Sequence, residues 1–137
     1  MISENIKPGN FFKFEGLRIY HKSVDFTNAI LSLSNACQTE AQRTLCDLFI
    51  KEAMNISSYL IEGASGTRTA FIDELQKAKV SIGKCVALCT LAAKQRLADE
   101  TQEADIRNEL MELTNMIGAL ILSFQKHDSA NAPEPDA

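Results

Sequence analysis

The sequence predicts a single all-α domain, folded as an antiparallel up-and-down four-helix bundle. The chain has 137 residues, of which 45% are hydrophobic and 23% charged, and these values are typical of one globular domain with one core. Apolar residues recur with helical spacing in four segments, and no segment shows the alternation that is typical of a β-strand. Because the connections between these segments are short, we expect successive helices to run antiparallel.

The first predicted helix covers residues 17–36 and differs from the others in having two apolar faces. The faces consist of Leu17, Tyr20, Val24 and Leu31 on one side, and of Ile19, Phe26, Ile30 and Leu33 on the other. A helix in a simple bundle needs only one apolar stripe to contribute to the core. The surplus face is therefore expected to meet another molecule.

The second predicted helix covers residues 39–62 and carries both a start and a stop signal. Thr39 and Gln42 form a capping-box pair at its beginning, and Gly63 is expected to end it in a left-handed conformation. Its main apolar stripe consists of Leu45, Phe49, Ala53, Ile56 and Leu60. Additional apolar side chains lie beside this stripe, and they add to the surplus surface of the first helix.

The third and fourth predicted helices each have one seam with steps of three and four residues. The third seam consists of Phe71, Leu75, Ala78, Ile82, Cys85, Cys89 and Ala92, and the fourth of Ile106, Leu110, Leu113, Ile117, Leu120 and Phe124. Asp99 and Gln102 form a second capping-box pair before the fourth helix. The breaks between helices are expected at residues 37–38, 63–66 and 97–98.

The predicted bundle occupies residues 15–127, between two segments of different composition. Residues 1–14 contain a proline and a glycine and are expected to form an irregular lead-in whose phenylalanines dock on the bundle. Residues 128–137 form an acidic, proline-containing tail that we expect to be disordered. Neither a signal peptide nor an apolar stretch of membrane-spanning length is found, which predicts a cytoplasmic protein with reduced cysteines and no membrane partner.

The formal net charge of −4 is unevenly distributed along the chain. Residues 65–97 carry six basic and two acidic side chains, a net charge of +4, whereas residues 98–127 carry two basic and six acidic ones, a net charge of −4. Without the charges of the acidic tail, the rest of the chain is nearly neutral. It lacks the broad basic surface that nucleic-acid binding usually requires, so nucleic acid is a less favoured partner than protein.

Two candidate surfaces follow from these patterns. The first is an interface between identical copies, formed by Ile19, Phe26, Ile30, Leu33, Ile50, Met54 and Ile61. The second is a basic face of the third helix that would bind RNA or DNA, formed by Arg68, Lys77, Lys79, Lys84, Lys94 and Arg96. Two plainer interpretations stay open, namely that the apolar residues thicken the core and that the basic ones are ordinary solvated side chains.

No catalytic or metal-binding pattern is found in the sequence. The histidines, His21 and His127, lack the Glu-x-x-His pairs of bundle di-iron sites. Cys85 and Cys89 lie one helical turn apart, but zinc sites usually have closer Cys or His pairs on loops, so we expect these cysteines to pack as small apolar residues. The sequence thus predicts a protein that is not an enzyme and has no catalytic residues, no metal site and no cofactor.

Three motifs resemble those of a known family. Residues 14–22, with the sequence FEGLRIYHK, resemble the opening F-E-x-L-x-V-(W/Y)-x-K of the 23S rRNA intervening-sequence four-helix-bundle proteins. Residues 56–63, with the sequence ISSYLIEG, resemble that family's I-P-S-N-I-A-E-G, although Ser57 and Tyr59 replace the usual proline and asparagine. Residues 71–81 are similar to its F-I-x-x-L-x-x-A-x-x-S helix, and the similarity extends over about residues 14–126.

This resemblance implies a bacterial four-helix bundle that assembles as a ring-shaped homopentamer without established enzymatic activity. The family is similar to the accessory proteins of diversity-generating retroelements, which are basic pentamers that bind nucleic acid and a reverse transcriptase. This chain lacks their strong positive charge. The predicted function is therefore a homo-oligomeric scaffold or interaction module, which could also bind a protein partner, and the alternative is a nucleic-acid-associated protein that uses the basic face of its third helix.

Overall fold

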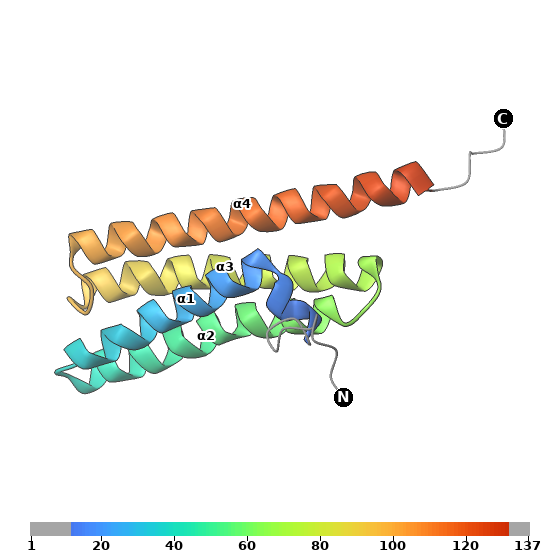
Figure 1. The fold of residues 1–137 in the computed structure, drawn as a ribbon. Helices are drawn as coiled ribbons and strands as arrows, with labels where there is room; N and C mark the ends of the chain where they lie inside the picture. The colour runs from blue at the N-terminus through green and yellow to red at the C-terminus, as the bar shows by residue number, and fades with distance from the viewer. Residues whose placement is uncertain (1–11, 132–137) are drawn as a thin grey trace.

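Four α-helices make up most of the part of the chain that the structure describes (Figure 1). The computed structural model describes residues 12–131, with side chains up to residue 126. Its elements are the 3-10 helix η2 (Lys13–Gly16), α1 (Arg18–Leu33), the 3-10 helix η3 (Ser34–Ala36), α2 (Glu40–Ala64), α3 (Arg68–Lys94) and α4 (Glu100–Asn131). Residues 12–131 contain no strand. The predicted all-α four-helix bundle is therefore confirmed.

The helices are unequal in length and in how closely they pack. Helix α3 lies between α2 and α4 and contacts both, and the contact between α2 and α3 is the most extensive in the bundle (Figure 1). Helix α1 has 16 residues and packs chiefly on α2, whereas α4 has 32 residues and extends past the other helices at its C-terminal end. The side between α1 and α4 is consequently the least closely packed.

Both predicted capping boxes are present. Thr39 Oγ1 accepts a hydrogen bond from the Gln42 backbone N–H at 3.0 Å, and Gln42 Oε1 accepts one from the Thr39 N–H at 3.3 Å. Asp99 and Gln102 make the same reciprocal pair before α4, with distances of 2.8 and 2.9 Å. Gln42 also donates from Nε2 to the Gln95 carbonyl at 2.9 Å. This bond ties the start of α2 to the end of α3.

The rotation of α1 corrects one of the sequence predictions. Ile19, Phe26, Ile30 and Leu33, which were predicted to meet a second copy, face the inside of the bundle, and Ile30 is 0% exposed. The Phe26 ring packs against Phe49 of α2 with a centroid distance of 6.3 Å. Side chains that are already covered within one chain cannot contact a partner, so the interface assignment is wrong for these four residues.

The seams of the third and fourth helices form the other half of the core. All seven seam residues of α3 are buried, and those of α4 are buried from Ile106 to Ile117. Near the end of α4 the buried position passes to Ile121, while Leu120 is only half-buried. The Phe71 and Phe124 rings close this end of the core, with their centroids 5.1 Å apart.

Gly63 lies inside α2 and is not the left-handed terminator that the sequence suggested. A Cβ atom at this position would stand 2.6 Å from Cδ1 of Phe71 and 3.2 Å from Cβ of Glu74, so the absent side chain lets α3 approach α2 closely. The left-handed conformation occurs instead at Arg96, with φ of 58°. There the Leu97 N–H bonds to the Ala92 carbonyl at 2.9 Å, which is the long hydrogen bond of a Schellman-type helix end.

Helix α4 extends beyond residue 127, where the sequence analysis placed the end of the bundle. The backbone of α4 continues to Asn131, so residues 128–131 are helical and not disordered. Pro133 follows two residues later, and helices usually end at or before the residue that precedes a proline. Residues 1–11 and 132–137 lie outside the described residues, and the predictions made for them stay untested.

We expect Ile30→Ala to destabilise the fold by about 2–5 kcal/mol, because it removes a fully buried side chain and leaves a cavity. Urea unfolding followed by circular dichroism measures this effect. Leu31→Ala is the matched control, because Leu31 is exposed and should change the stability far less. An equal loss in the two variants would contradict the observed rotation of α1.

We expect Gly63→Ala to destabilise the protein by about 1–3 kcal/mol, because the added methyl group overlaps Phe71 and forces α2 and α3 apart. Gly118→Ala is the control, since a Cβ there meets nothing within 4 Å. The control should be neutral or stabilising by up to about 1 kcal/mol, because alanine is the better helix former. Thermal unfolding should show a lower midpoint for Gly63→Ala and an unchanged or higher midpoint for Gly118→Ala; a stabilised Gly63→Ala variant would refute the close approach.

Candidate interaction groove

Exposed apolar side chains of α1 and α2 line one groove, which we call the α1/α2 groove. Val24 and Leu31 contribute from α1, and Met54 and Ile61 from α2, with exposed fractions of 41, 46, 56 and 36%. The groove has a volume of about 540 Å³. Its polar lining residues are Asp25, Thr27, Asn28, Ser57 and Ser58. The groove is thus mainly apolar, with Asp25 as the charged residue among those that line it.

The residue spacing explains why the four apolar side chains come together. Val24 and Leu31 are seven residues apart in α1, and Met54 and Ile61 are seven residues apart in α2. Seven residues are close to two turns of an α-helix, so each pair lies along one side of its helix. The two sides face the same groove because α1 packs on α2.

Small hydroxyl side chains lie between α1 and α2, where Thr27 and Ser57 line the groove. Ser23 is fully buried, and its Oγ donates to the Tyr20 carbonyl at 2.6 Å. The Oγ atoms of Ser23 and Ser57 are 2.8 Å apart, so the Ser57 hydroxyl is the donor in that pair. Thr27 Oγ1 donates to the Ser23 carbonyl at 3.0 Å. These hydroxyl groups make their hydrogen bonds inside the protein, so they can lie between the helices without losing hydrogen bonds. Because the side chains are short, they leave the groove open between α1 and α2.

A second depression continues the α1/α2 groove toward the N-terminal side of α1. Its lining includes Phe12 and Phe14, which precede α1, together with Glu62 and Ala64 of α2, and it shares Ile61 with the α1/α2 groove. The Phe14 and Tyr20 rings meet edge to face with centroids 5.0 Å apart. Phe14 therefore packs against α1 at this point.

The predicted interface residues are divided between the groove and the core. Met54 and Ile61 line the groove, and Ile50 is half-buried against the core. Val24 and Leu31 were not assigned to the interface, although the sequence placed them on an apolar stripe of the first helix. Periodicity identified both stripes of that helix, but it could not tell which of them the other helices would cover.

The six basic residues predicted to bind nucleic acid are all exposed, but they do not gather on one face. Lys77 and Lys84, seven residues apart, lie on one flank of α3, and Lys77 bonds to Glu74 Oε1 at 2.9 Å. Lys79 is two residues, or about 200°, beyond Lys77 and so lies on a different side of the helix. Arg96 lies outside α3, in the turn before α4. The structure spreads these charges along and around the helix.

The chain matches the model of the 23S rRNA-intervening sequence protein family over residues 15–119. It belongs to this family. The match includes α1, α2 and α3 and most of α4, so all four apolar residues that line the α1/α2 groove lie within it. Searches of curated proteins and of solved structures found no match.

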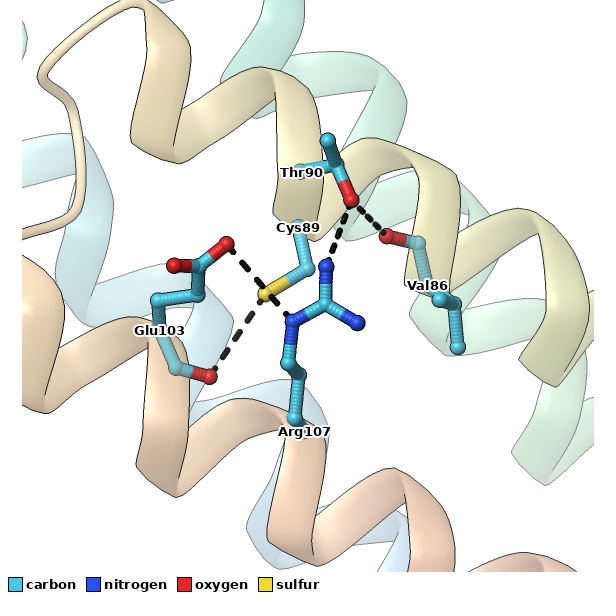
Figure 2. Close-up of polar contacts among 5 residues, drawn as sticks. All are labelled: Val86, Cys89, Thr90, Glu103 and Arg107. Carbon is cyan, nitrogen blue, oxygen red and sulfur yellow. Dashed lines mark hydrogen bonds and ion pairs between the residues drawn. The ribbon is translucent and has the colours of Figure 1, made fainter.

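In this member of the 23S rRNA-intervening sequence family, Cys89 of α3 is a packing residue at the contact between α3 and α4 (Figure 2). Cys89 is buried, and its Sγ lies 3.8 Å from the Glu103 carbonyl oxygen. Beside it Arg107 donates to Thr90 Oγ1 at 2.6 Å and pairs with Glu103 at 3.6 Å. Figure 2 shows Thr90, Glu103 and Arg107 beside the Cys89 thiol.

Burial controls the acidity of three thiols. Desolvation raises the pKa of Cys85 to about 12, and together with the neighbouring Cys37 it raises the pKa of Cys46 to about 11. Desolvation also raises the pKa of Cys89. A thiol with a raised pKa is rarely ionised at neutral pH and is a poor nucleophile and metal ligand. Among the described residues, no three His, Cys, Asp or Glu side chains are placed to share a metal ion.

Two further polar contacts link elements of the fold. Lys22 of α1 pairs with Glu112 of α4, and this hydrogen bond and charge hold the pKa of Glu112 below its usual value. Partial burial raises the pKa of the neighbouring Glu109. His21 bonds through Nε2 to the Glu15 carbonyl at 2.5 Å and so fastens η2 to α1. Of the helices in residues 12–131, none has a stretch apolar and long enough to cross a bilayer.

We expect a thiol reagent such as iodoacetamide to modify Cys37 alone in the native protein at neutral pH. Cys37 is half-buried, whereas the other three thiols are buried and have raised pKa values. Mass spectrometry should find one modified cysteine under native conditions and four in urea. Rapid native labelling of Cys85 or Cys89 would show that the contact between α3 and α4 opens readily.

Proposed function

We propose that this family member is a non-enzymatic scaffold that assembles with copies of itself through the α1/α2 groove. The observation that carries the proposal is the gathering of Val24, Leu31, Met54 and Ile61 in one depression. Scattered apolar side chains are normal on a protein surface, but a contiguous apolar patch marks an interaction site. Five subunits is the number that the family resemblance suggests.

The energetics support association. Fully burying a large aliphatic side chain contributes about 1.5–3 kcal/mol, and each of the four groove side chains still exposes roughly half of its surface. Each would then contribute roughly 1 kcal/mol when a partner covers the groove. An assembly of identical copies repeats this contribution at every interface. Because every copy presents the same groove, another copy of the chain is an available partner.

The nucleic-acid alternative has weaker support. Its basic residues are exposed, but they lie on several sides of α3, and the acidic side chains of α4 are adjacent. Nucleic-acid binding by scattered phosphate contacts would fall steeply with salt. We place the scaffold in the cytoplasm, where free cysteines such as those of this chain stay reduced.

The test is the mass of the assembly in solution, measured by light scattering coupled to size exclusion. We expect the wild type to form an assembly of the 15.1-kDa chain and Met54→Asp to shift the mass toward the monomer. Met111→Asp is the matched control, because Met111 is exposed to 57%, against 56% for Met54, but lies outside the groove. The control should keep the wild-type mass.

Circular dichroism should show the same helicity in all three proteins, because both methionines are on the surface. A wild type that is monomeric at tens of micromolar would overturn the proposal. So would an equal loss of assembly in Met54→Asp and Met111→Asp, because the groove would then have no special role.

A further inference from the structure

A second apolar surface runs along the outside of α3, and we call it the α3 ridge. It consists of Val80, Gly83, Ala87 and Leu91, all exposed, with Val80 at 61%. Helix α3 packs between α2 and α4 and is not a direct neighbour of α1 in the bundle (Figure 1). The ridge therefore cannot fill the α1/α2 groove of its own chain. Only a second molecule can bring the two surfaces together.

The spacing of the α3 ridge matches that of the groove. Val80 and Ala87 are seven residues apart, as are the two apolar residues that each helix contributes to the groove. Equal steps of two turns let the side chains of a third helix alternate with those of the two helices that flank a groove. Gly83 lies between them, and a Cβ there would meet nothing within 4 Å. No packing inside the chain requires this glycine, while a helix docking against the ridge gains a closer approach from it.

Charge distinguishes this ridge from a similar stripe on α4. Met111, Gly118 and Leu122 have the same seven- and four-residue steps as Val80, Ala87 and Leu91. The α4 stripe, however, has the exposed acidic side chains of Asp105 and Glu112 on its helix.

The groove itself contains Asp25 as its charged residue, whereas its extension contains both Glu62 and Lys13. The carboxylate of Asp25 would repel the acidic α4 of another copy. On α3, Lys84 and Lys94 accompany the ridge and are exposed. Complementary charge therefore favours the α3 ridge as the surface that enters the groove.

We propose that the α3 ridge of one copy docks into the α1/α2 groove of the next. The contact is heterologous, because the two surfaces differ, and it can repeat from copy to copy until the assembly closes into a ring. The inference rests on the proposed function and adds to it the surface that the groove receives. It also assigns a role to the basic residues of α3 that does not involve nucleic acid.

Site-directed cross-linking tests this contact. In a Cys37→Ser background, which removes the accessible thiol, a chain carrying both Met54→Cys and Ala87→Cys is treated with a short bismaleimide. Neighbouring copies should become joined through groove and ridge, which gives a ladder of multiples of the 15.1-kDa chain on a denaturing gel. The matched control carries Met54→Cys and Gly118→Cys, which pairs the groove with the α4 stripe, and should give no ladder.

The outcomes separate the inference from the proposed function. A ladder with the α3 pair but not with the α4 pair supports the docking. Dimers from Met54→Cys alone would mean that groove meets groove, and a ladder from the α4 pair alone would move the contact to α4; either result overturns the inference. An assembly that light scattering detects but neither pair cross-links would overturn the inference and leave the proposed function standing, whereas a monomer would overturn both.

Discussion

The contact of Phe26 and Ile30 with α2 determines how α1 is rotated, and the exterior of the molecule depends on that rotation. With Ile30 fully buried and Phe26 packed on Phe49, the opposite side of α1 has to face solvent. Val24 and Leu31 are on that side. The same packing that builds the core therefore produces the apolar groove.

Hydrogen bonds at the helix ends keep this arrangement in register. The Gln42 side chain serves both its own N-cap and the Gln95 carbonyl at the end of α3, so one residue joins two ends of the bundle. At the other end of α2, Gly63 has no side chain, and the Phe71 ring occupies the space that a Cβ atom would need. Contacts at both ends of the α2–α3 pair fix the pair on which α1 and α4 are then placed.

In this member of the 23S rRNA-intervening sequence family, the interior and the surface differ in character. Three buried thiols have raised pKa values, and the carboxylate of Glu112 is held in an ion pair with Lys22. The distinctive features are on the surface instead, as apolar residues repeated every two turns on α1, α2 and α3. This surface supports the proposed role as a scaffold.

The sequence by itself determined the four helices, the capping boxes of α2 and α4, and the residues of the α3 seam and of the α4 seam as far as Ile117, because these depend on local spacing and on hydrogen bonds between residues three apart. It also identified both apolar stripes of α1 and two of the groove residues, Met54 and Ile61. Only the tertiary structure decided which stripe is covered, since that choice depends on how large side chains from distant helices fit together. For the same reason Gly63 was misread as a local terminator, when its role is to admit a side chain from another helix.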